Sequence, residues 1–233
     1  MTGTQRNVRA AGVTTPGWPE IVVALAVLAV VAYGVGFLLR PLGLDPVVHG
    51  LLLSALSGVA GIAGFLAAVR LRVRSLAPFG LVRTSVRWML LGVAGGVLTF
   101  LLSRVWGVVI YAAGWQPENI QQPYTDAGSA GVWSVVVSLL LLAVLTPIGE
   151  ELTFRGVVTT ALMRYGAVVA VVGSAVVFAL MHGINAVFVT ALIVGLVTAE
   201  MRRRSGSVWP GVAVHVVNNA LAQAMALLVA AAL

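Results

Sequence analysis

Long apolar segments, separated by short stretches that contain arginine or other polar residues, make up most of this sequence of 233 residues. A segment of roughly 20 apolar residues can cross a bilayer as a helix, because each helical residue advances the chain by about 1.5 Å. Charged residues are only 9% of the chain, whereas a soluble domain carries about 25%. We therefore predict an integral membrane protein, which excludes a soluble enzyme, a disordered chain and a nucleic-acid-binding module.

About seven of these segments are predicted to span the membrane, so the expected fold is an all-α, polytopic transmembrane helical bundle. The fourth segment begins near Val132 and continues past Pro147 to the charged residues around Glu150. Residues 1–20 are predicted to form a cytoplasmic tail, and residues 21–233 a single transmembrane domain. The other six predicted spans are residues 21–39, 47–69, 88–113, 167–181, 186–199 and 208–233.

The positions of the arginines predict the orientation of the bundle. All fourteen basic residues are Arg. If the N-terminus is cytoplasmic, twelve of them face the cytoplasm, among them Arg155 and Arg164, while Arg40 faces outside and Arg104 lies within a span. Cytoplasmic loops are enriched in Arg and Lys, so this orientation is favoured. We expect an integral protein of a bacterial plasma membrane, whose net charge of +7 reports topology and not nucleic-acid binding.

Small and aromatic residues add two expectations about packing. Gly92 and Gly96 form a GxxxG pair, and Ser57 and Gly61 form a similar small pair, so close helix contacts are predicted at both. Tryptophans gather at membrane interfaces, and Trp18 and Trp209 are expected at the inner interface and Trp133 at the outer one. The chain has no cysteine, which excludes disulfides and thiolate chemistry.

Ionisable residues inside apolar segments are the strongest indication of function. Each costs about 2.5–3.5 kcal/mol at the centre of a bilayer on insertion scales, so each needs a physical reason. Glu150 and Glu151 lie in the fourth segment, His182 at the end of the fifth, and His215 in the seventh. These residues are predicted to meet in one polar pocket. A single histidine in an apolar segment is common, but ionisable residues in three separate segments of so apolar a chain are unusual.

The other ionisable residues are assigned structural roles. Glu200 is predicted to end a helix and to pair with Arg204 at i,i+4. Arg104 either reaches the interface or pairs, or it faces a water-filled cavity, and His49 is expected to be inert in an outer loop. The remaining acids are expected in tails or loops, namely Glu20, Asp45, Glu118 and Asp126.

Helical spacing groups the candidate residues into three pairs. Arg155 follows Glu151 at i,i+4, so the two can form an ion pair, while Glu150 points about 100° away. His215 and Asn219 share one helix face, and Phe178, expected to be a pocket wall, precedes His182 by one turn, whereas Asn218 is expected to pack between helices. Residue counts from the turn at 164–166 put Glu150 and His182 at similar depth, so the pocket is predicted to open toward the cytoplasmic side.

This set of side chains can hydrolyse an acyl bond without a serine or cysteine nucleophile. A carboxylate beside a histidine can hold and deprotonate water, and a second histidine with an asparagine can donate hydrogen bonds to an oxyanion. In a membrane, a peptide bond in or near the bilayer is the expected substrate. Glu150, His182 and His215 could instead bind zinc with an open position for water, although no HExxH helix is present. The metal-free form is favoured because ligation would occupy the histidine that the oxyanion needs.

Three motifs resemble those of a known family, the CPBP intramembrane proteases, which include the type II CAAX prenyl endopeptidases and the bacterial Abi proteins. Residues 150–156, EELTFRG, resemble the EExxxR motif. Residues 178–182, FALMH, are similar to FxxxH, and residues 215–219, HVVNN, to HxxxN. The stretch 204–210 before the third motif and the turn Phe79-Gly80-Leu81 also resemble the family. The motifs occupy residues 150–219, in the C-terminal half.

The resemblance implies a helical membrane protease and a role for each motif. Glu150 and His182 would activate water, and His215 and Asn219 would form the oxyanion hole. Glu151 and Arg155 would brace the site. The family is often labelled metalloprotease, so zinc stays the alternative cofactor. Prenylated CAAX tails are typical substrates of eukaryotic members, and an unprenylated peptide or a membrane protein is an equally good candidate here.

The sequence therefore predicts an intramembrane endopeptidase that acts on a peptide or membrane-protein substrate. The alternative is a non-catalytic membrane scaffold or immunity protein that binds peptide or lipid in the same pocket. A small transporter is disfavoured, because the sequence shows no repeated halves. The sequence does not determine the oligomeric state.

Overall fold

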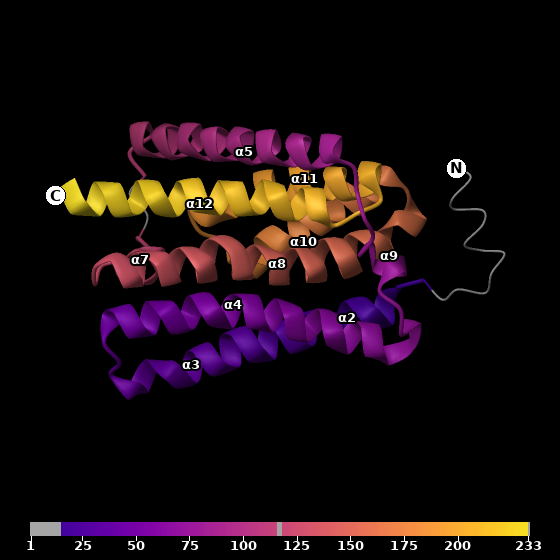
Figure 1. The fold of residues 1–233 in the computed structure, drawn as a ribbon, viewed down its shortest axis with the longest axis horizontal. Helices are drawn as coiled ribbons and strands as arrows, with labels where there is room; N and C mark the ends of the chain where they lie inside the picture. Colours follow the sequence, from indigo (N-terminus) through magenta and orange to yellow (C-terminus); the bar gives the residue numbers. More distant parts are fainter. Residues whose placement is uncertain (1–14, 116–117, 233) are drawn as a thin grey trace.

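A computed structural model describes residues 15–115 and 118–232, and these residues form helices without any strand (Figure 1). The first fourteen residues of the predicted cytoplasmic tail lie outside the described residues. Five helical rods in the described part are long and apolar enough to cross a membrane. They are Trp18–Leu42, Pro46–Val73, Val86–Ala112, Val132–Tyr165 and Trp209–Ala232.

The first three rods form a hairpin and a separate helix. The first rod joins α2 (Trp18–Ala29), the π-helical η1 (Val30–Val35), α3 (Gly36–Leu39) and η2 (Arg40–Leu42). The second joins α4 (Pro46–Ala68) to the π-helical η3 (Val69–Val73). After η4 (Ala77–Phe79), the third rod is α5 (Val86–Ala112), and the short α6 (Gln122–Asp126) follows.

The fourth rod is one continuous helix through Pro147, as the sequence predicts. Pro147 lies in the first turn of α8, directly after a π-helical stretch, and such irregular turns accommodate a residue without an N–H. The rod joins α7 (Val132–Ser138), η5 (Leu139–Leu145), α8 (Thr146–Glu151), η6 (Leu152–Thr159), α9 (Thr160–Leu162) and η7 (Met163–Tyr165). The last rod is α12 (Trp209–Ala232).

The fifth and sixth predicted spans form a helical hairpin, and neither arm is both long and apolar enough to count as a membrane span. Its first arm joins η8 (Val169–Gly173) to α10 (Ser174–Met181) and is about 20 Å long, whereas a hydrocarbon core is about 30 Å thick. Its second arm, α11 (Val187–Ser205), carries Glu200 and three arginines in its last turns. The count of seven spans and the cytoplasmic N-terminus stay predictions. A hairpin that enters and leaves the bilayer on the same side replaces two spans without changing the side on which α12 begins. The predicted direction in which α12 crosses the membrane is therefore unchanged.

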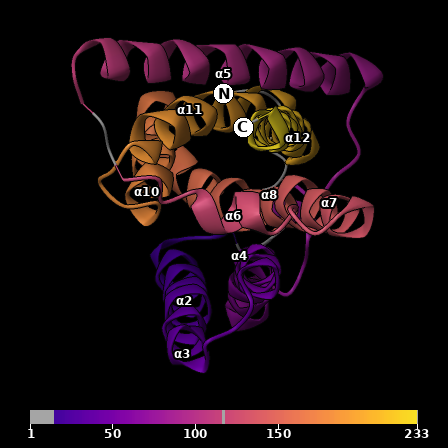
Figure 2. The ribbon, with the colours of Figure 1, turned by 90° about the vertical axis from the view of Figure 1, so that its left-hand side faces the viewer.

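The helices pack in layers around the fourth rod. Viewed from one end, α5 lies on one face, followed by a layer of α10, α11 and α12, then the fourth rod with α6, and finally the α2–α4 hairpin (Figure 2). α5 crosses the others obliquely, and α2 and α4 run side by side (Figures 1 and 2). The fourth rod, which carries Glu150, therefore has protein on both sides.

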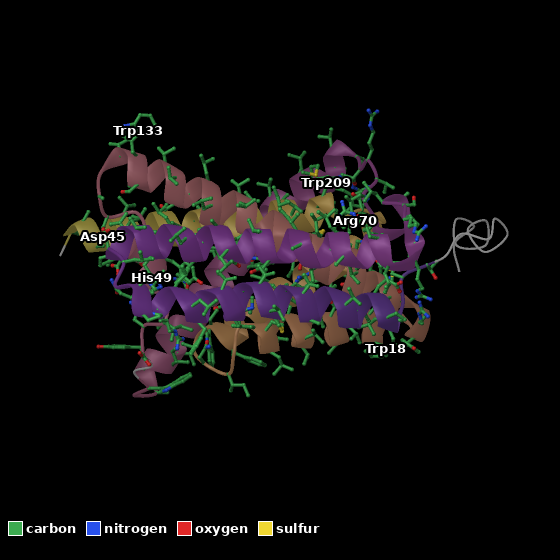
Figure 3. The ribbon with its side chains drawn as sticks, turned by 90° about the horizontal axis from the view of Figure 1, so that it is seen from below. Trp18, Asp45, His49, Arg70, Trp133 and Trp209 are labelled. Carbon is green, nitrogen blue, oxygen red and sulfur yellow. The ribbon has the colours of Figure 1, made fainter. Side chains whose placement is uncertain are left out.

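The two ends of the bundle differ in charge. Trp18, Arg70 and Trp209 lie at one end, and Asp45, His49 and Trp133 lie at the other (Figure 3). The first end is called the arginine-rich end here, because it also holds the helix ends and loops with Arg72, Arg74, Arg83, Arg87, Arg164, Arg202, Arg203 and Arg204. The tryptophans thus divide between the ends as the sequence predicts.

Both predicted small-residue pairs lie at close helix contacts. A Cβ on Gly92 would be 2.6 Å from the Pro210 carbonyl oxygen, and a Cβ on Gly96 would be 2.6 Å from the Val214 oxygen. These glycines let α5 pack directly on α12. A Cβ on Gly61 would be 2.3 Å from the carbonyl carbon of Gly149. This contact between α4 and α8 brings backbone against backbone one residue before Glu150.

Glu20 is part of the helix and not of a solvated tail, which corrects the sequence-based expectation. The first helix begins at Trp18, and the Glu20 carboxylate is fully buried. It accepts hydrogen bonds from the Gly17 amide at 2.8 Å and from Arg72 Nε at 2.8 Å. Sequence reasoning missed this bond because Arg72 is 52 residues away and lies at the end of another rod.

The predicted pair of Glu200 with Arg204 is confirmed. Arg203 also binds Glu200, because its Nε and Nη2 each donate to a carboxylate oxygen at 2.7 Å. The hydrogen bond from Arg203 lowers the pKa of Glu200 to about 2. This cluster at the end of α11 is half-exposed, so it contributes little to stability and mainly keeps charge at the arginine-rich end.

Candidate functional site

Glu150 is held at the centre of the bundle by a close contact between α4 and α8. Gly149 approaches Gly58 so closely that a Cβ would be 2.1 Å from its oxygen, and this contact fixes the backbone beside Glu150. Ser57 Oγ on α4 donates to Glu150 Oε1 at 3.0 Å. Glu150 Oε2 is buried and has no hydrogen-bond partner among the described atoms. One carboxylate oxygen is thus fixed by a hydrogen bond, and the other is buried with its hydrogen-bonding capacity unused.

Glu151 and Arg155 form the predicted ion pair, with Glu151 Oε2 3.2 Å from Arg155 Nε. Both side chains are completely buried. Arg155 Nη2 also donates to the Gly195 carbonyl on α11 at 3.3 Å, and its guanidinium lies 4.5 Å from the centroid of the Phe178 ring. The expectation that Arg155 faces the cytoplasm is therefore wrong, because this side chain joins helices inside the bundle.

His215 on α12 connects the two glutamates. Its Nδ1 lies 3.0 Å from Glu151 Oε1 and its Nε2 lies 3.8 Å from Glu150 Oε2. Because a carboxylate only accepts, Nδ1 carries the proton that bonds Glu151. The imidazole is almost completely buried, and the Phe178 ring packs nearly perpendicular to it with the centroids 5.7 Å apart.

His182 ends α10 and reaches the site from the hairpin. Its Nδ1 donates to the Phe178 carbonyl oxygen at 2.9 Å. A carbonyl only accepts hydrogen bonds, so the lone pair of the neutral ring is on Nε2. The Phe178 ring lies 4.6 Å from the His182 ring and thus contacts both histidines and Arg155, in agreement with the predicted wall. Among the described residues, His182 has no carboxylate within ion-pair distance, whereas His215 has two.

Asn219 lies one turn after His215, as the spacing predicts. Its Nδ2 donates to the Leu142 carbonyl at 3.1 Å, and its Oδ1 accepts from Asn218 Nδ2 at 3.1 Å. Leu142 is in the π-helical η5, where the regular helical hydrogen bonds are interrupted. The second N–H of Asn219 is available. Asn218, expected to be a packing residue, has a buried Oδ1 without a partner and also lines the site.

Two cavities meet at Glu150 and His182, and Ser57 and Tyr124 also line both. The α12 cavity has a volume of about 670 Å³ and lies among α5, α10, α11 and α12; His215 and Asn219 line it. The α3 cavity, of about 780 Å³, lies among the α2–α4 hairpin, α6 and α10. Volumes of this size accommodate a peptide segment.

Both cavities run from the site toward the end of the bundle that holds Asp45, and away from the arginine-rich end. The α12 cavity is lined by residues 103–111 of α5 and 215–226 of α12, and the α3 cavity by residues 28–40. A core that includes Phe79, Phe154 and Val208 fills the other direction. The cavities therefore do not support the predicted opening toward the cytoplasmic side.

Ser57 and Tyr124 are site residues that the sequence did not indicate as such. Ser57 was assigned only to helix packing, and it bonds the catalytic candidate Glu150. Tyr124 comes from α6, in a polar stretch predicted to be a loop, and its carbonyl accepts from Gln223 on α12. No local pattern marks either residue, because each reaches the site only through contacts between distant helices.

The three candidate zinc ligands do not form a coordination set. Glu150 and His215 are close, with 3.8 Å between Oε2 and Nε2, whereas His182 has no carboxylate within ion-pair distance among the described residues. No group of three or more His, Asp or Glu side chains in residues 15–115 and 118–232 is placed to hold a metal ion. The arrangement as described does not fit a resident metal.

The helices and the site define a membrane protein of all-helical fold with a buried carboxylate–histidine centre. Residues 132–221 match the family model described as type II CAAX prenyl endopeptidase Rce1-like. The match contains all three motifs and confirms the predicted resemblance to the CPBP/CAAX protease family. Comparisons with curated proteins and with solved structures give no match. The family and the five apolar helices thus indicate a membrane protein of the protease class.

Proposed function

We propose that this protein is an intramembrane endopeptidase that hydrolyses a peptide bond with a water molecule activated by Glu150. The observation that carries the proposal is the position of Glu150 Oε2. This oxygen is buried, lacks a hydrogen-bond partner, and belongs to a residue that lines two peptide-sized cavities. A buried carboxylate oxygen without a partner is costly unless it acts on a ligand or water.

Glu150 and His182 are proposed to bind and deprotonate the water. Glu150 Oε2 and the Nε2 lone pair of His182 are two acceptors at the junction of the cavities. A water that donates to both has its oxygen lone pairs free to attack a carbonyl carbon. Ser57 fixes the second oxygen of Glu150, which keeps Oε2 in place during proton transfer.

His215 and Asn219 are proposed to stabilise the oxyanion of the tetrahedral intermediate. His215 donates from Nε2 when both ring nitrogens carry protons, and Glu151 stabilises that cationic form through Nδ1. Asn219 contributes the N–H that does not bond Leu142. Both donors line the α12 cavity together with Glu150, so one bound carbonyl can face the water and the donors.

Glu151, Arg155 and Phe178 are proposed to position the site without contacting the substrate. Glu151 orients His215, and Arg155 neutralises the charge of Glu151 in the interior. The Phe178 ring separates the two histidines, and its carbonyl sets the tautomer of His182. No step in this mechanism uses a metal, because the described side chains do not form a ligand set.

The proposed substrate is a peptide segment or a membrane protein that reaches the site from the bilayer. The surface that lines each cavity is mainly apolar. This suits an apolar peptide, with or without a prenyl group. With the N-terminus in the cytoplasm of a bacterial cell, as the arginines predict, both cavities extend into the outer half of the membrane.

Replacement of Glu150 tests the proposal directly. Membranes that contain the wild-type protein are compared by proteomics with membranes that contain Glu150→Ala or Glu150→Gln. Loss of a general base lowers the rate by about 10²–10⁴-fold, so cleavage products seen with the wild type should disappear in both variants. Glu118→Gln, in an exposed segment, is the matched control and should leave the products unchanged.

The two variants also separate the enzyme from the alternative of a non-catalytic scaffold or immunity protein. An isosteric amide at position 150 still accepts and donates hydrogen bonds but cannot remove a proton. A biological effect that persists in Glu150→Gln, without any difference in peptides, would support the scaffold and reject the protease.

A further inference from the structure

Arg104 is a cation in the apolar part of α5 that has no ionic partner in the described part of the chain. No carboxylate lies within ion-pair distance, and the nearest aromatic contact is the Phe100 ring, 5.4 Å from the guanidinium carbon. The side chain is exposed, and it lines the α12 cavity together with Glu150, His182 and His215. An unpaired arginine at membrane depth is costly, which indicates a function.

Among the described residues that line the α12 cavity, one is acidic and one is an arginine, and they lie in different parts of it. Glu150 is its acidic residue and Arg104 its arginine among all the residues that line it. Trp106, two residues after Arg104, lines the same cavity, and its buried indole Nε1 has no acceptor among the described atoms. This part of the cavity therefore presents hydrogen-bond donors and positive charge, whereas the catalytic part contains a carboxylate.

The register between α5 and α12 gives the distance between these two parts. Both helices start at the arginine-rich end, and Gly96 packs on Val214, the residue before His215. Arg104 is two helical turns, roughly 12 Å, beyond Gly96 along α5, and because α5 crosses α12 obliquely this length runs partly across the bundle. An extended peptide advances about 3.3–3.6 Å per residue, so three to four residues cover this length.

We propose that Arg104 is a specificity residue that binds a carboxylate of the substrate three to four residues from the scissile bond. The carboxylate is either the C-terminus of the peptide or an acidic side chain. Arg binds carboxylates with paired, charge-assisted hydrogen bonds, and an apolar cavity strengthens them. This inference rests on the proposed function, because it describes the substrate of the same site.

The test uses two pools of fluorescence-quenched apolar decapeptides that differ only at the C-terminus, which is a free acid or an amide. The full chain in lipid vesicles is assayed as wild type, Arg104→Gln, Arg104→Lys and Arg87→Gln. Arg87 is an exposed arginine on the same helix outside the cavity, so its variant is the control. A third pool carries an aspartate three or four residues after the centre and a C-terminal amide.

The wild type and Arg87→Gln should cleave the acid pool, or the aspartate pool, with a KM roughly tenfold or more below that of the plain amide pool. In Arg104→Gln this ratio should fall to about one through KM, with kcat for the acid pool kept. Arg104→Lys should keep part of the preference. The acid and aspartate pools then tell which carboxylate is bound. A ratio in Arg104→Gln equal to that of the wild type overturns the inference.

A binding measurement separates this inference from the proposed function. The same pools are titrated against Glu150→Gln, with and without Arg104→Gln, and the thermal unfolding midpoint of each variant confirms its fold. Carboxylate-dependent binding that needs Arg104, without cleavage by the wild type, would reject the protease and keep the inference. Cleavage by the wild type without any dependence on Arg104 would support the protease and reject the inference about Arg104. Competition by phosphatidylglycerol vesicles, but by no peptide pool, would assign Arg104 to a lipid phosphate and reject the carboxylate.

Discussion

Two π-helical segments have opposite surroundings in this protein. None of the six residues of η1 (Val30–Val35) is buried, whereas all eight residues of η6 (Leu152–Thr159) are. Val30 is 71% exposed and Val157 is completely covered. In a bilayer, lipid tails are as apolar as a protein core, so hydrophobicity does not decide which of the two segments is inside.

Polar and small residues distinguish the two segments. In η6, Thr153 Oγ1 donates to the Gly61 carbonyl at 2.7 Å, Thr159 Oγ1 donates to Ser174 at 2.8 Å, and Arg155 joins the site. In η1, the Tyr33 hydroxyl is the side-chain donor, and it bonds the Met181 carbonyl at the rim of the α3 cavity. The comparison teaches that hydrogen bonds between helices select the interior position, because these groups have no partner in lipid.

Loss of the buried cation in η6 should have the largest effect. Arg155→Leu leaves Glu151 charged in the interior, and breaking such a pair typically costs about 3–5 kcal/mol. The thermal midpoint of the purified protein should fall strongly, and peptide cleavage should be lost with it. The double variant Glu151→Gln with Arg155→Leu removes both charges and should recover part of the midpoint. A midpoint close to that of the wild type in Arg155→Leu would mean that η6 is not held by this pair.

A matched pair of phenylalanines sharpens the comparison at the next level. Phe154 in η6 is 1% exposed, and Phe37 in α3, which follows η1, is 67% exposed. Phe154→Ala opens a cavity in the core and should destabilise by about 3 kcal/mol, whereas Phe37→Ala removes a ring that is already exposed beside the α3 cavity and should cost little. Denaturant titration of both variants in the same detergent measures the difference. Equal losses would contradict the assignment of the first rod around Phe37 to the exposed side.

Glycine substitutions should have a smaller effect in the same direction. A Cβ on Gly61 would be 2.3 Å from Gly149, while no atom lies within 4 Å of a Cβ on Gly34 in η1. Gly61→Ala must push α4 from α8, which costs about 1–3 kcal/mol and moves Glu150. Gly34→Ala should be neutral, since it meets open space. Thermal midpoints and cleavage rates of the two variants would show whether the α4–α8 contact positions the site.

Much of the site could be predicted from local spacing. Residues four apart on one helix share a face, so the ion pair of Glu151 with Arg155 and the common position of His215 and Asn219 in the α12 cavity follow from the helix period alone. The convergence of three segments follows from the cost of ionisable groups in lipid. The buried position of Glu20 could not be predicted, because its partner Arg72 belongs to another rod.

The sequence by itself determined that the chain forms apolar helices, that its ionisable residues gather, and which motifs carry them. Only the tertiary structure decided that Ser57 fixes Glu150, that the α10–α11 hairpin falls short of a span, and that the cavities run away from the arginine-rich end. The physical reason is that helix period and transfer energy act within a segment, whereas the direction of a cavity depends on how distant helices fill space.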